Sequence, residues 1–347
     1  MRNEKVKVVI WGFGAMGSGI AKMILKKQGF EIIGVCDKNP NYIGKNICEI
    51  LQIKTNQKDV FVCNDIKQIN LEGCDVAILA TDSYTKTSFE KIKFLLEQKV
   101  NVISTAEEMS YPWAKCPDLS QQLDEIAKKN GVTVLGTGVN PGMMMDLLAI
   151  FLTGVCEDVS LIEVSRVNSL SPFGKTVMEE QGVGLSQADF LTLQTEGKIA
   201  GHIGFKESVY MIKDALGLNI NHFEQQMEPI ITDVDRKSPY GFAKKGDVCG
   251  VNMQAWAYEN KELKIKLHHP QQIEPQLGNV QTGDYITIHG NPSIEMKISP
   301  EVNGGIGTIA ICVNMIPHII NASPGLKTMI DLPVPRAILG DVREFID

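Results

Sequence analysis

Two neighbouring glutamates, Glu107 and Glu108, follow a short apolar run in the segment Val102–Pro112, which reads VISTAEEMSYP. A carboxylate can attract a cation, accept a proton from it and stabilise a positive charge that develops during a reaction. If the apolar run is a buried strand, its end delivers both side chains to one edge of a sheet. We therefore take Glu107 and Glu108 as the catalytic candidates. The simpler alternative is that the N-terminus of a helix favours acidic residues there.

A glycine pattern near the start of the chain predicts a binding loop for a dinucleotide. The apolar run Val8–Ile10 is followed by Gly12, Gly14 and Gly17 in the order G-x-G-x-x-G. The first glycine permits a tight turn, the second lets the backbone approach a pyrophosphate, and the third lets helix and strand pack closely. A helix N-terminus adds N–H groups and a partial positive charge for the phosphates. The expected cofactor-binding residues of this loop are Gly12, Phe13, Gly14, Ala15, Met16 and Gly17.

Three polar residues after later strands extend the expected cofactor site. Asp37 lies 20 residues after Gly17. Its carboxylate can accept hydrogen bonds from both ribose hydroxyls of NAD and repels the 2′-phosphate of NADP. Lys38 beside it can soften that repulsion, so we expect NAD, with NADP as the second choice. Thr81 and Ser83 are expected near the nicotinamide ribose, because ligands of such sheets bind at the carboxyl ends of the strands.

The elements that must position these residues alternate between strands and helices over residues 1–140. We expect strands at Val6–Ile10, Phe30–Cys36, Asp59–Cys63, Asp75–Ala80, Val100–Ile103 and Val132–Leu135, and helices at Ser18–Lys27, Lys86–Gln98 and Asp118–Asn130. This rhythm predicts an α/β fold with a doubly wound, parallel Rossmann sheet.

A second α+β domain with a mostly antiparallel sheet is expected over residues 141–302. Its expected elements are helices at Met143–Phe151 and Phe205–Leu216, strands at Val159–Val167 and Glu262–Leu267, and a hairpin of Tyr285–Gly290 with Ser293–Ile298. The closing segment 303–347, with an apolar helix at Ile309–Ile320, is expected to rejoin the first domain. The open sheet needs cover on its exposed face, which predicts a homodimer through the second domain.

Composition excludes several classes of function. The chain has 347 residues, which is longer than a single hydrophobic core usually supports, so two domains are expected. Its net charge is −7 and it has no block of basic residues, so nucleic acid is not an expected partner. The start is charged and no stretch reaches the 18 or so apolar residues of a membrane helix, which predicts a cytoplasmic protein without a membrane partner. The eight cysteines and six histidines show no metal-ligand spacing, so no metal is expected.

The motifs together resemble a known family, and the resemblance spans the chain. It rests on the GFGAMG opening, the STAEEMSYP segment, Asn140–Gly142, Arg166–Asn168 and the closing Gly304–Ala310. In this combination the chain resembles 2,4-diaminopentanoate dehydrogenase of ornithine fermentation and the native amine dehydrogenases. These belong to the two-domain Rossmann enzymes that include dihydrodipicolinate reductase.

The resemblance implies amine chemistry at the glutamate pair. In related alcohol and sugar dehydrogenases the fifth strand ends in a motif such as T-A-N-K, and Thr105–Glu108 places Glu108 where the functional lysine would be. A glutamate suits an ammonium group instead. The implied reaction is NAD(P)-dependent oxidative deamination of 2,4-diaminopentanoate to 2-amino-4-oxopentanoate and ammonia. Glu108 would bind the amine and act as the base, and Glu107 remains the alternative, because one residue of misalignment exchanges them.

A diamino acid substrate also carries a carboxylate and a second ammonium. Arg166 is the expected partner of the carboxylate, because a guanidinium can pair with it bidentately. It could equally be an arginine on a solvated sheet face. Asn140, Asn168 and His268 are the other expected substrate-binding residues.

Two other functions are compatible with a glycine loop at the start of the chain. A dihydrodipicolinate reductase is expected to carry a histidine pair beside a K-x-D-x-P-S-G-T segment, and residues 163–176, EVSRVNSLSPFGKT, contain neither. A non-catalytic NAD-binding sensor would need the glycine loop but no paired carboxylates. Such a sensor would bind NADH and show no turnover with an amine.

Overall fold

The computed structural model describes residues 2–347, so Met1 of the expected first domain lies outside the described residues. The chain forms two compact units. The first contains the residues up to Met143 together with Gly304–Asp347, and the second contains Met144–Asn303.

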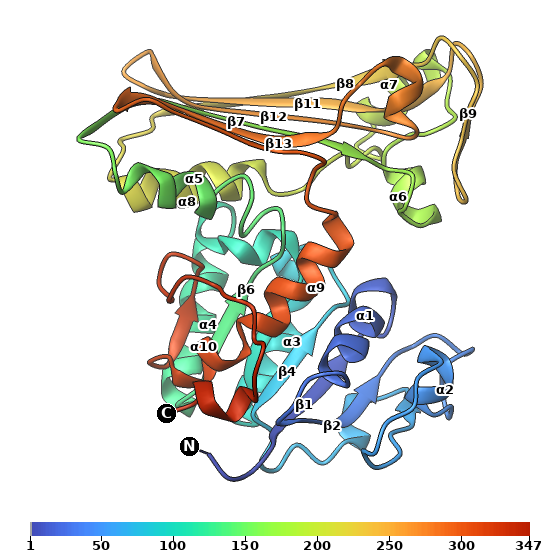
Figure 1. Cartoon of the computed structure of the whole chain (residues 1–347), viewed down its shortest axis with the longest axis vertical. Helices are drawn as coiled ribbons and strands as arrows, with labels where there is room; N and C mark the ends of the chain where they lie inside the picture. Colours follow the sequence, from blue (N-terminus) through green and yellow to red (C-terminus); the bar gives the residue numbers. More distant parts are fainter. Residues whose placement is uncertain (1) are drawn as a thin grey trace. The chain divides into compact units, whose positions relative to one another are not determined.

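The first unit is built on a seven-stranded sheet in which all neighbouring strands run parallel (Figure 1). Its order is β15-β6-β5-β4-β1-β2-β3. The strands are β1 (Val6–Trp11), β2 (Phe30–Cys36), β3 (Val62–Cys63), β4 (Val76–Leu79), β5 (Asn101–Ser104), β6 (Thr133–Gly136) and β15 (Gly325–Lys327). The helices are α1 (Ala15–Ile24), α2 (Ile47–Leu51), α3 (Thr85–Glu97), α4 (Pro117–Asn130), α9 (Gly304–Asn314) and α10 (Ile316–Asn321). The predicted doubly wound Rossmann sheet is confirmed, and its strand order reverses between β1 and β4.

The central strands form because their apolar runs are buried on both faces, as parallel sheets require. Every residue of β4 is buried, and β1 has a largely buried pattern. Most bounds expected over residues 1–140 differ from the observed ones by one residue, and two elements differ by more. The strand expected at Asp59–Cys63 contains only Val62–Cys63, because β3 is the sheet edge and pairs with β2 over two residues. Helix α1 begins at Ala15 rather than Ser18, because the glycine loop leads directly into its first turn.

The closing segment belongs to the first unit. Strand β15 adds to the sheet beside β6, and α9 packs against α1, where a Cβ on Gly19 would lie 2.2 Å from Ile309. The single helix expected at Ile309–Ile320 is two helices, because Pro317 in the first turn of α10 cannot continue the hydrogen-bond ladder of α9.

The stretch Gly304–Asn321 is long and apolar enough to cross a membrane by length and composition, with a mean hydropathy of 1.3. The expectation that no stretch reaches this threshold is therefore wrong. The structure divides the stretch between α9 and α10, which pack on α1 and β6. The stretch is 39% buried inside the structure, and one such stretch is weak evidence for a membrane span.

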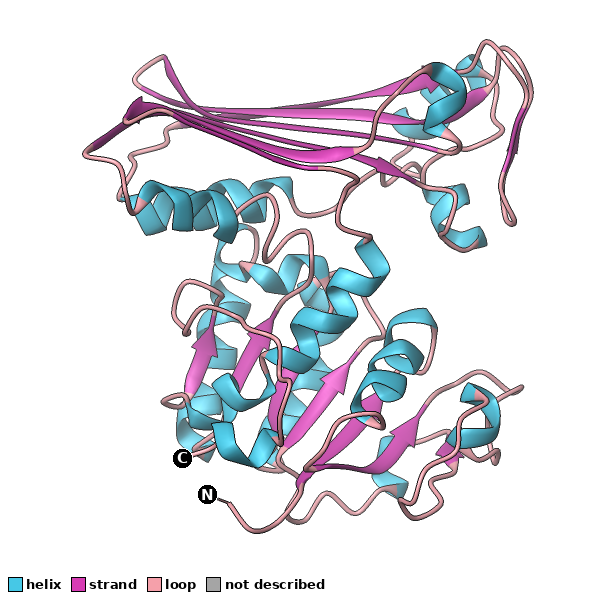
Figure 2. Ribbon diagram, viewed as in Figure 1, coloured by secondary structure: helices cyan, strands magenta, loops and turns pink. Residues whose placement is uncertain are grey.

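The second unit contains a six-stranded sheet of order β14-β13-β7-β12-β11-β8, in which only β7 and β12 run parallel (Figure 2). Its strands are β7 (Asp158–Ser169), β8 (His222–Ile231), β11 (Val248–Glu259), β12 (Glu262–Gln272), β13 (Gly283–Asn291) and β14 (Ile294–Ile298), with a small separate pair β9 (Arg236–Lys237) and β10 (Phe242–Ala243). The helices are α5 (Leu147–Thr153), α6 (Lys175–Glu180), α7 (Gln187–Thr195) and α8 (Phe205–Leu216). The expected mostly antiparallel sheet and the β13–β14 hairpin are confirmed.

The two faces of this sheet differ, because side chains alternate along each strand. Ile162 and Val164 of β7 and Leu267 of β12 join a core with residues of α5 and α8, which lie along that face (Figure 1). Arg166 has the same parity as Ile162 and Val164, so it points to the helix-covered face. The predicted helix at Met143–Phe151 begins later, at Leu147, where the Asp146 carboxylate accepts a hydrogen bond from the Leu147 N–H.

Candidate functional site

The loop between β1 and α1 fits a dinucleotide. Gly12 has φ +98°, and a Cβ there would lie 2.4 Å from the Ala80 carbonyl oxygen. A Cβ on Gly17 would lie 1.8 Å from the Gly12 carbonyl oxygen, so neither position accepts another residue. Gly14 differs, because it is exposed and a Cβ there would meet nothing within 4 Å. That open position, beside a helix N-terminus that no side chain caps, suits a pyrophosphate.

The other residues of the loop contribute backbone rather than side chains. The Phe13 ring is fully buried and packs edge-on against Tyr42, with ring centroids 6.1 Å apart. Ala15 is exposed and Met16 is half-buried at the start of α1. Phe13 therefore holds the loop in place, whereas Ala15 and Met16 offer their N–H groups to a ligand from the first turn.

Asp37 directly follows β2 and is joined to the glycine loop. Its Oδ2 accepts a hydrogen bond from the Phe13 N–H, and its Oδ1 accepts one from the Asn39 N–H at 2.7 Å. Each carboxylate oxygen can accept a second hydrogen bond. The carboxylate can therefore orient the loop and still accept from ribose hydroxyls, as the sequence predicts.

Thr81 and Ser83 follow β4 and take part in two local networks. The Thr81 hydroxyl donates to Asp82, and the Lys91 ammonium donates to the Thr81 hydroxyl at 3.0 Å and to the Asp82 carboxylate at 2.5 Å. The Ser83 carbonyl accepts from the Glu108 N–H at 3.1 Å. Sequence reasoning missed Lys91 because nothing in its spacing links it to Thr81. It is a cation on α3 that the fold brings to the carboxyl end of β4.

The two candidate catalytic glutamates have different surroundings. Glu108 is 7% exposed; its Oε2 accepts from the Thr85 N–H at the start of α3 at 3.0 Å, and its Oε1 accepts from the Lys115 ammonium at 3.2 Å. Glu107 is half-buried and begins the 3₁₀ segment Glu107–Ser110, where the Ser110 hydroxyl donates to its carbonyl at 2.8 Å. Successive side chains of a 3₁₀ turn point about 120° apart. The geometry therefore makes Glu108 an anchor between β5 and α3, and it favours Glu107 as the reactive carboxylate.

Arg166 of the second unit is 2% exposed and its guanidinium is already engaged. Nη1 forms an ion pair with Asp284, and Nη2 donates to the Val302 carbonyl at 2.5 Å. Asp284 in turn accepts from the Val302 N–H at 2.8 Å. This geometry is that of a structural ion pair, and it weighs against the predicted pairing of Arg166 with a substrate carboxylate.

Asn168 lies two residues further along β7 on the same face and is 5% exposed. It is in register with Gln271 of β12. Asn168 Oδ1 and Gln271 Nε2 are buried and have no hydrogen-bond partner among residues 2–347. A buried polar atom without a protein partner carries a desolvation cost, which a ligand group of the opposite hydrogen-bonding kind would remove. Sequence reasoning missed Gln271, although its alternation with Leu267 and His269 could have indicated its face.

The structure does not bring His268 together with Arg166 and Asn168. Its ring contacts the Ser165 hydroxyl at 3.2 Å and the Asn252 amide oxygen at 2.8 Å, on the opposite face of the sheet. Burial, followed by the charge of Lys266, lowers the pKa of His268.

His269 is the histidine on the helix-covered face. Its Nδ1–H donates to the Arg166 carbonyl at 2.6 Å, and burial lowers its pKa well below the usual range. Asn140, the remaining expected substrate residue, is half-buried in the loop after β6, in the first unit.

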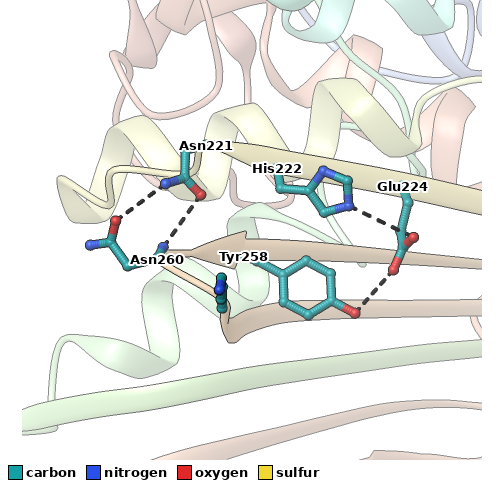
Figure 3. Close-up of a pocket in the computed structure, with 6 residues that line it drawn as sticks. Asn221, His222, Glu224, Tyr258 and Asn260 are labelled. Carbon is teal, nitrogen blue, oxygen red and sulfur yellow. Dashed lines mark hydrogen bonds and ion pairs between the residues drawn. The ribbon is translucent and has the colours of Figure 1, made fainter.

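A hollow of about 560 Å³ lies at the ends of β8 and β11 and contains none of the predicted residues (Figure 3). Dashed lines in Figure 3 join Tyr258 and His222 to the Glu224 carboxylate. The Tyr258 hydroxyl donates to Glu224 at 3.0 Å, and His222 Nε2 lies 3.8 Å from the same carboxylate. His222 and Glu224 are exposed, and the interactions join side chains within the sheet. No group of three or more histidine, cysteine or acidic residues within residues 2–347 could hold a metal ion.

Comparison with known proteins agrees with this geometry. The family model of the 2,4-diaminopentanoate dehydrogenase C-terminal domain matches residues 143–347, and that of the dihydrodipicolinate reductase N-terminus matches residues 6–135. A 2,4-diaminopentanoate dehydrogenase from Acetoanaerobium sticklandii is 56% identical over 345 residues, 99% of this chain and 98% of that protein. An amine dehydrogenase from Streptomyces virginiae is 20% identical over 96% of this chain and 98% of that protein. The structure of amine dehydrogenase from Mycobacterium smegmatis matches with a TM-score of 0.86 and 25% identity, covering 97% of this chain and 99% of that one.

The fold, the glycine loop and these similarities define a two-domain, NAD(P)-dependent dehydrogenase of the amine dehydrogenase type. The resemblance that the sequence motifs indicated is confirmed. The chain belongs to the 2,4-diaminopentanoate dehydrogenase family. The match to dihydrodipicolinate reductase covers the N-terminal region only, as expected for a shared cofactor domain.

Proposed function

We propose that this protein oxidises 2,4-diaminopentanoate with NAD(P)⁺ and water to 2-amino-4-oxopentanoate, ammonia, NAD(P)H and a proton. The observation that carries the choice of substrate is the 56% identity to a 2,4-diaminopentanoate dehydrogenase over nearly the whole of both chains. The glutamate pair after β5 supports the same chemistry, because a carboxylate at this edge of the sheet attracts an ammonium ion.

Glu107 is the residue we assign to the reacting amine. The bound nicotinamide cofactor supplies the acceptor for the hydride that leaves C4 of the substrate. Glu107 attracts the substrate ammonium, accepts a proton from it and stabilises the positive charge that develops at the C4–nitrogen bond as the hydride leaves. Glu108 positions Glu107 by fixing the start of the 3₁₀ segment to Thr85 at the start of α3.

Asn168 and Gln271 are the residues of the second unit that we assign to ligand binding. Asn168 Oδ1 can accept from an ammonium group, and Gln271 Nε2 can donate to a carboxylate. Both atoms are buried without a hydrogen-bond partner within residues 2–347, which costs free energy. A ligand that forms hydrogen bonds with them would remove this cost. The sequence predicts that Arg166 binds a substrate carboxylate. This pairing has less support, because Asp284 already neutralises the Arg166 guanidinium.

We further propose a cytoplasmic homodimer that forms through the second unit. The sheet face opposite α5 and α8 carries Trp256, Tyr258 and Tyr285, which alternate with buried residues of β11 and β13. Aromatic side chains of this kind are enriched at the cores of protein interfaces. Light scattering coupled to size exclusion tests the dimer, and a monomeric mass at micromolar concentration contradicts it.

The function is tested by following NADH absorbance with purified protein, NAD⁺ and 2,4-diaminopentanoate, and by identifying ammonia and the 4-oxo product. 2-Aminopentanoate and 4-aminopentanoate are suitable comparison amines, because each keeps the five-carbon chain and lacks one of the two amino groups. Turnover with the diamino acid that exceeds turnover with both comparison amines supports the proposal. Preference for either comparison amine contradicts the assigned substrate.

A further inference from the structure

Two cysteines lie side by side at the edge of the cofactor domain. Cys36 ends β2, Cys63 ends β3, and the two residues are direct partners in the parallel register of these strands. Partners in such a register point to the same face of the sheet. Both thiols are free, with Cys36 1% exposed and Cys63 half-buried. The Cys63 thiol also lies 3.2 Å from the Asp65 carbonyl oxygen.

The backbone of both cysteines holds the expected cofactor loop. The Cys36 carbonyl accepts from the Gly12 N–H at 2.8 Å, and the Cys63 carbonyl accepts from the Asp37 N–H at 3.0 Å. Asp37 directly follows Cys36 and accepts from the Phe13 N–H through its side chain. A displacement of either cysteine therefore changes the positions of Gly12 and Asp37.

We propose that Cys36 and Cys63 are an oxidisable dithiol, and that its conversion to a disulfide weakens binding of the nicotinamide cofactor. The oxidant is a low-molecular-weight disulfide. The Cys63 thiolate attacks one sulfur of the oxidant and releases one thiolate, which forms a mixed disulfide. Cys36 then attacks the Cys63 sulfur as its own proton leaves to solvent, and the second thiolate of the oxidant departs. Two protein thiols are oxidised and one disulfide molecule is reduced to two thiols.

Geometry explains why the disulfide would act on the cofactor loop. Neighbouring strands lie about 4.8 Å apart, which is within the range of about 4.4–6.8 Å between the Cα atoms of disulfide-bonded cysteines but below their usual separation of about 5.5–6 Å. The bond can therefore close between these register partners, and it shifts β3 relative to β2 as the Cα atoms move toward their usual separation. Strand β3 can move because it is two residues long and lies at the sheet edge. Asp37 and Gly12 follow this movement through their hydrogen bonds to the two cysteines.

The order of attack follows from the surroundings of the two thiols. Burial, the neighbouring Cys63 thiol, and the charges of Asp65 and Asp37 raise the pKa of Cys36 to about 12. Cys36 is therefore protonated at neutral pH and is a poor first nucleophile. Cys63 is the more accessible sulfur and meets the oxidant first.

The test uses the full-length protein treated with oxidised glutathione and then with an alkylating agent under denaturing conditions. We expect peptide mapping to find a Cys36–Cys63 linkage. We also expect NADH titration to show affinity reduced roughly tenfold, equivalent to about 1.4 kcal/mol, and restored by dithiothreitol. Cys63→Ser should keep its NADH affinity after the same treatment. Cys48→Ser is the matched control, because Cys48 is also half-buried in this domain, and it should respond as the parent does.

Three results would overturn the proposal. The first is oxidation of other cysteines without a Cys36–Cys63 linkage. The second is a linkage that leaves NADH affinity unchanged, and the third is a Cys63→Ser variant that loses affinity as the parent does. The effect on affinity rests on the proposed placement of the cofactor at Gly12 and Asp37. Asp37→Ala distinguishes a failure of the cofactor placement from a failure of the disulfide proposal. Unchanged NADH affinity in that variant would contradict the placement of the cofactor at Asp37. Formation of the Cys36–Cys63 disulfide does not depend on where the cofactor binds.

Discussion

The Glu108 carboxylate accepts a hydrogen bond from the Thr85 N–H at 3.0 Å and thereby joins the end of β5 to the start of α3. An acidic group at a helix N-terminus is stabilised by the partial positive charge there. The second carboxylate oxygen accepts from Lys115. Comparison with the T-A-N-K motif makes Glu108 the first catalytic candidate, but both of its carboxylate oxygens are held by the protein. We therefore assign the reaction to the neighbouring Glu107.

Glu108→Gln tests this supporting role. The amide keeps the shape but loses the charge, so we expect the free energy of unfolding to fall by about 1–2 kcal/mol. We expect kcat to fall by less than roughly tenfold, because the reacting groups remain in place. Urea unfolding and steady-state kinetics measure both. A variant of unchanged stability with an activity loss of several orders of magnitude would return the catalytic role to Glu108.

The glycine loop offers a pair of matched substitutions. Gly17→Ala places a Cβ 1.8 Å from the Gly12 carbonyl oxygen, and we expect a loss of about 1–3 kcal/mol in the free energy of unfolding. Gly14→Ala has room in the protein, so we expect its stability to change by less than about 1 kcal/mol. Its new methyl group projects where the pyrophosphate is expected, so NADH affinity should fall at least roughly tenfold. Calorimetry with and without NADH distinguishes the two variants, and normal NADH affinity in Gly14→Ala would contradict the placement.

Arg166 and Asp284 form an ion pair of which each side chain is 2% exposed. Removing one partner leaves a buried charge, so Arg166→Met should lower the free energy of unfolding by about 3–5 kcal/mol. Adding Asp284→Leu should recover only part of this loss, because Asp284 also accepts from the Val302 N–H. Chemical denaturation of the single and double variants provides the measurement. Normal stability in Arg166→Met, together with a raised KM, would show that Arg166 binds the substrate instead.

His269 predicts a loss of stability in mild acid. Burial, followed by the charges of His202 and Arg166, lowers its pKa in the folded state well below the usual 6.5. Below pH 6.5 the unfolded chain binds a proton at this residue that the folded chain does not bind. The contribution of this residue to the free energy of unfolding is therefore complete above pH 6.5. Below pH 6.5 the free energy of unfolding falls by up to about 1.4 kcal/mol per pH unit. His269→Gln should lack this part of the slope in denaturation curves between pH 5 and 7, and an unchanged slope would contradict the assignment.

Much of the cofactor domain could be predicted from the sequence because its signals are local. Apolar runs mark strands that are buried on both faces, and the glycines mark backbone positions that tolerate no side chain. Helix α8 was predicted with its observed bounds, Phe205–Leu216, because its apolar spacing lies between glycines at both ends.

The parts that could not be predicted depend on contacts between distant residues. Nothing in the sequence links Glu108 to Thr85, so the roles of Glu107 and Glu108 stayed open. The strand containing His268 was predicted to end at Leu267, but β12 continues to Gln272. The longer strand fixes the alternation that puts His268 on one face and His269 on the other. Asp284 lies 118 positions from Arg166, and only the sheet brings the two together.

Turnover of 2,4-diaminopentanoate by Glu107→Gln, beside the parent and Glu108→Gln, is the most direct test of the proposed chemistry. The amide cannot accept the proton of the amine or balance its charge, so we expect kcat to fall by about 10²–10⁴-fold. NADH affinity and the unfolding midpoint should match the parent, which shows that the fold and the cofactor site are intact. A Glu107→Gln enzyme that turns over at the parental rate would contradict the assignment of Glu107 as the reactive carboxylate.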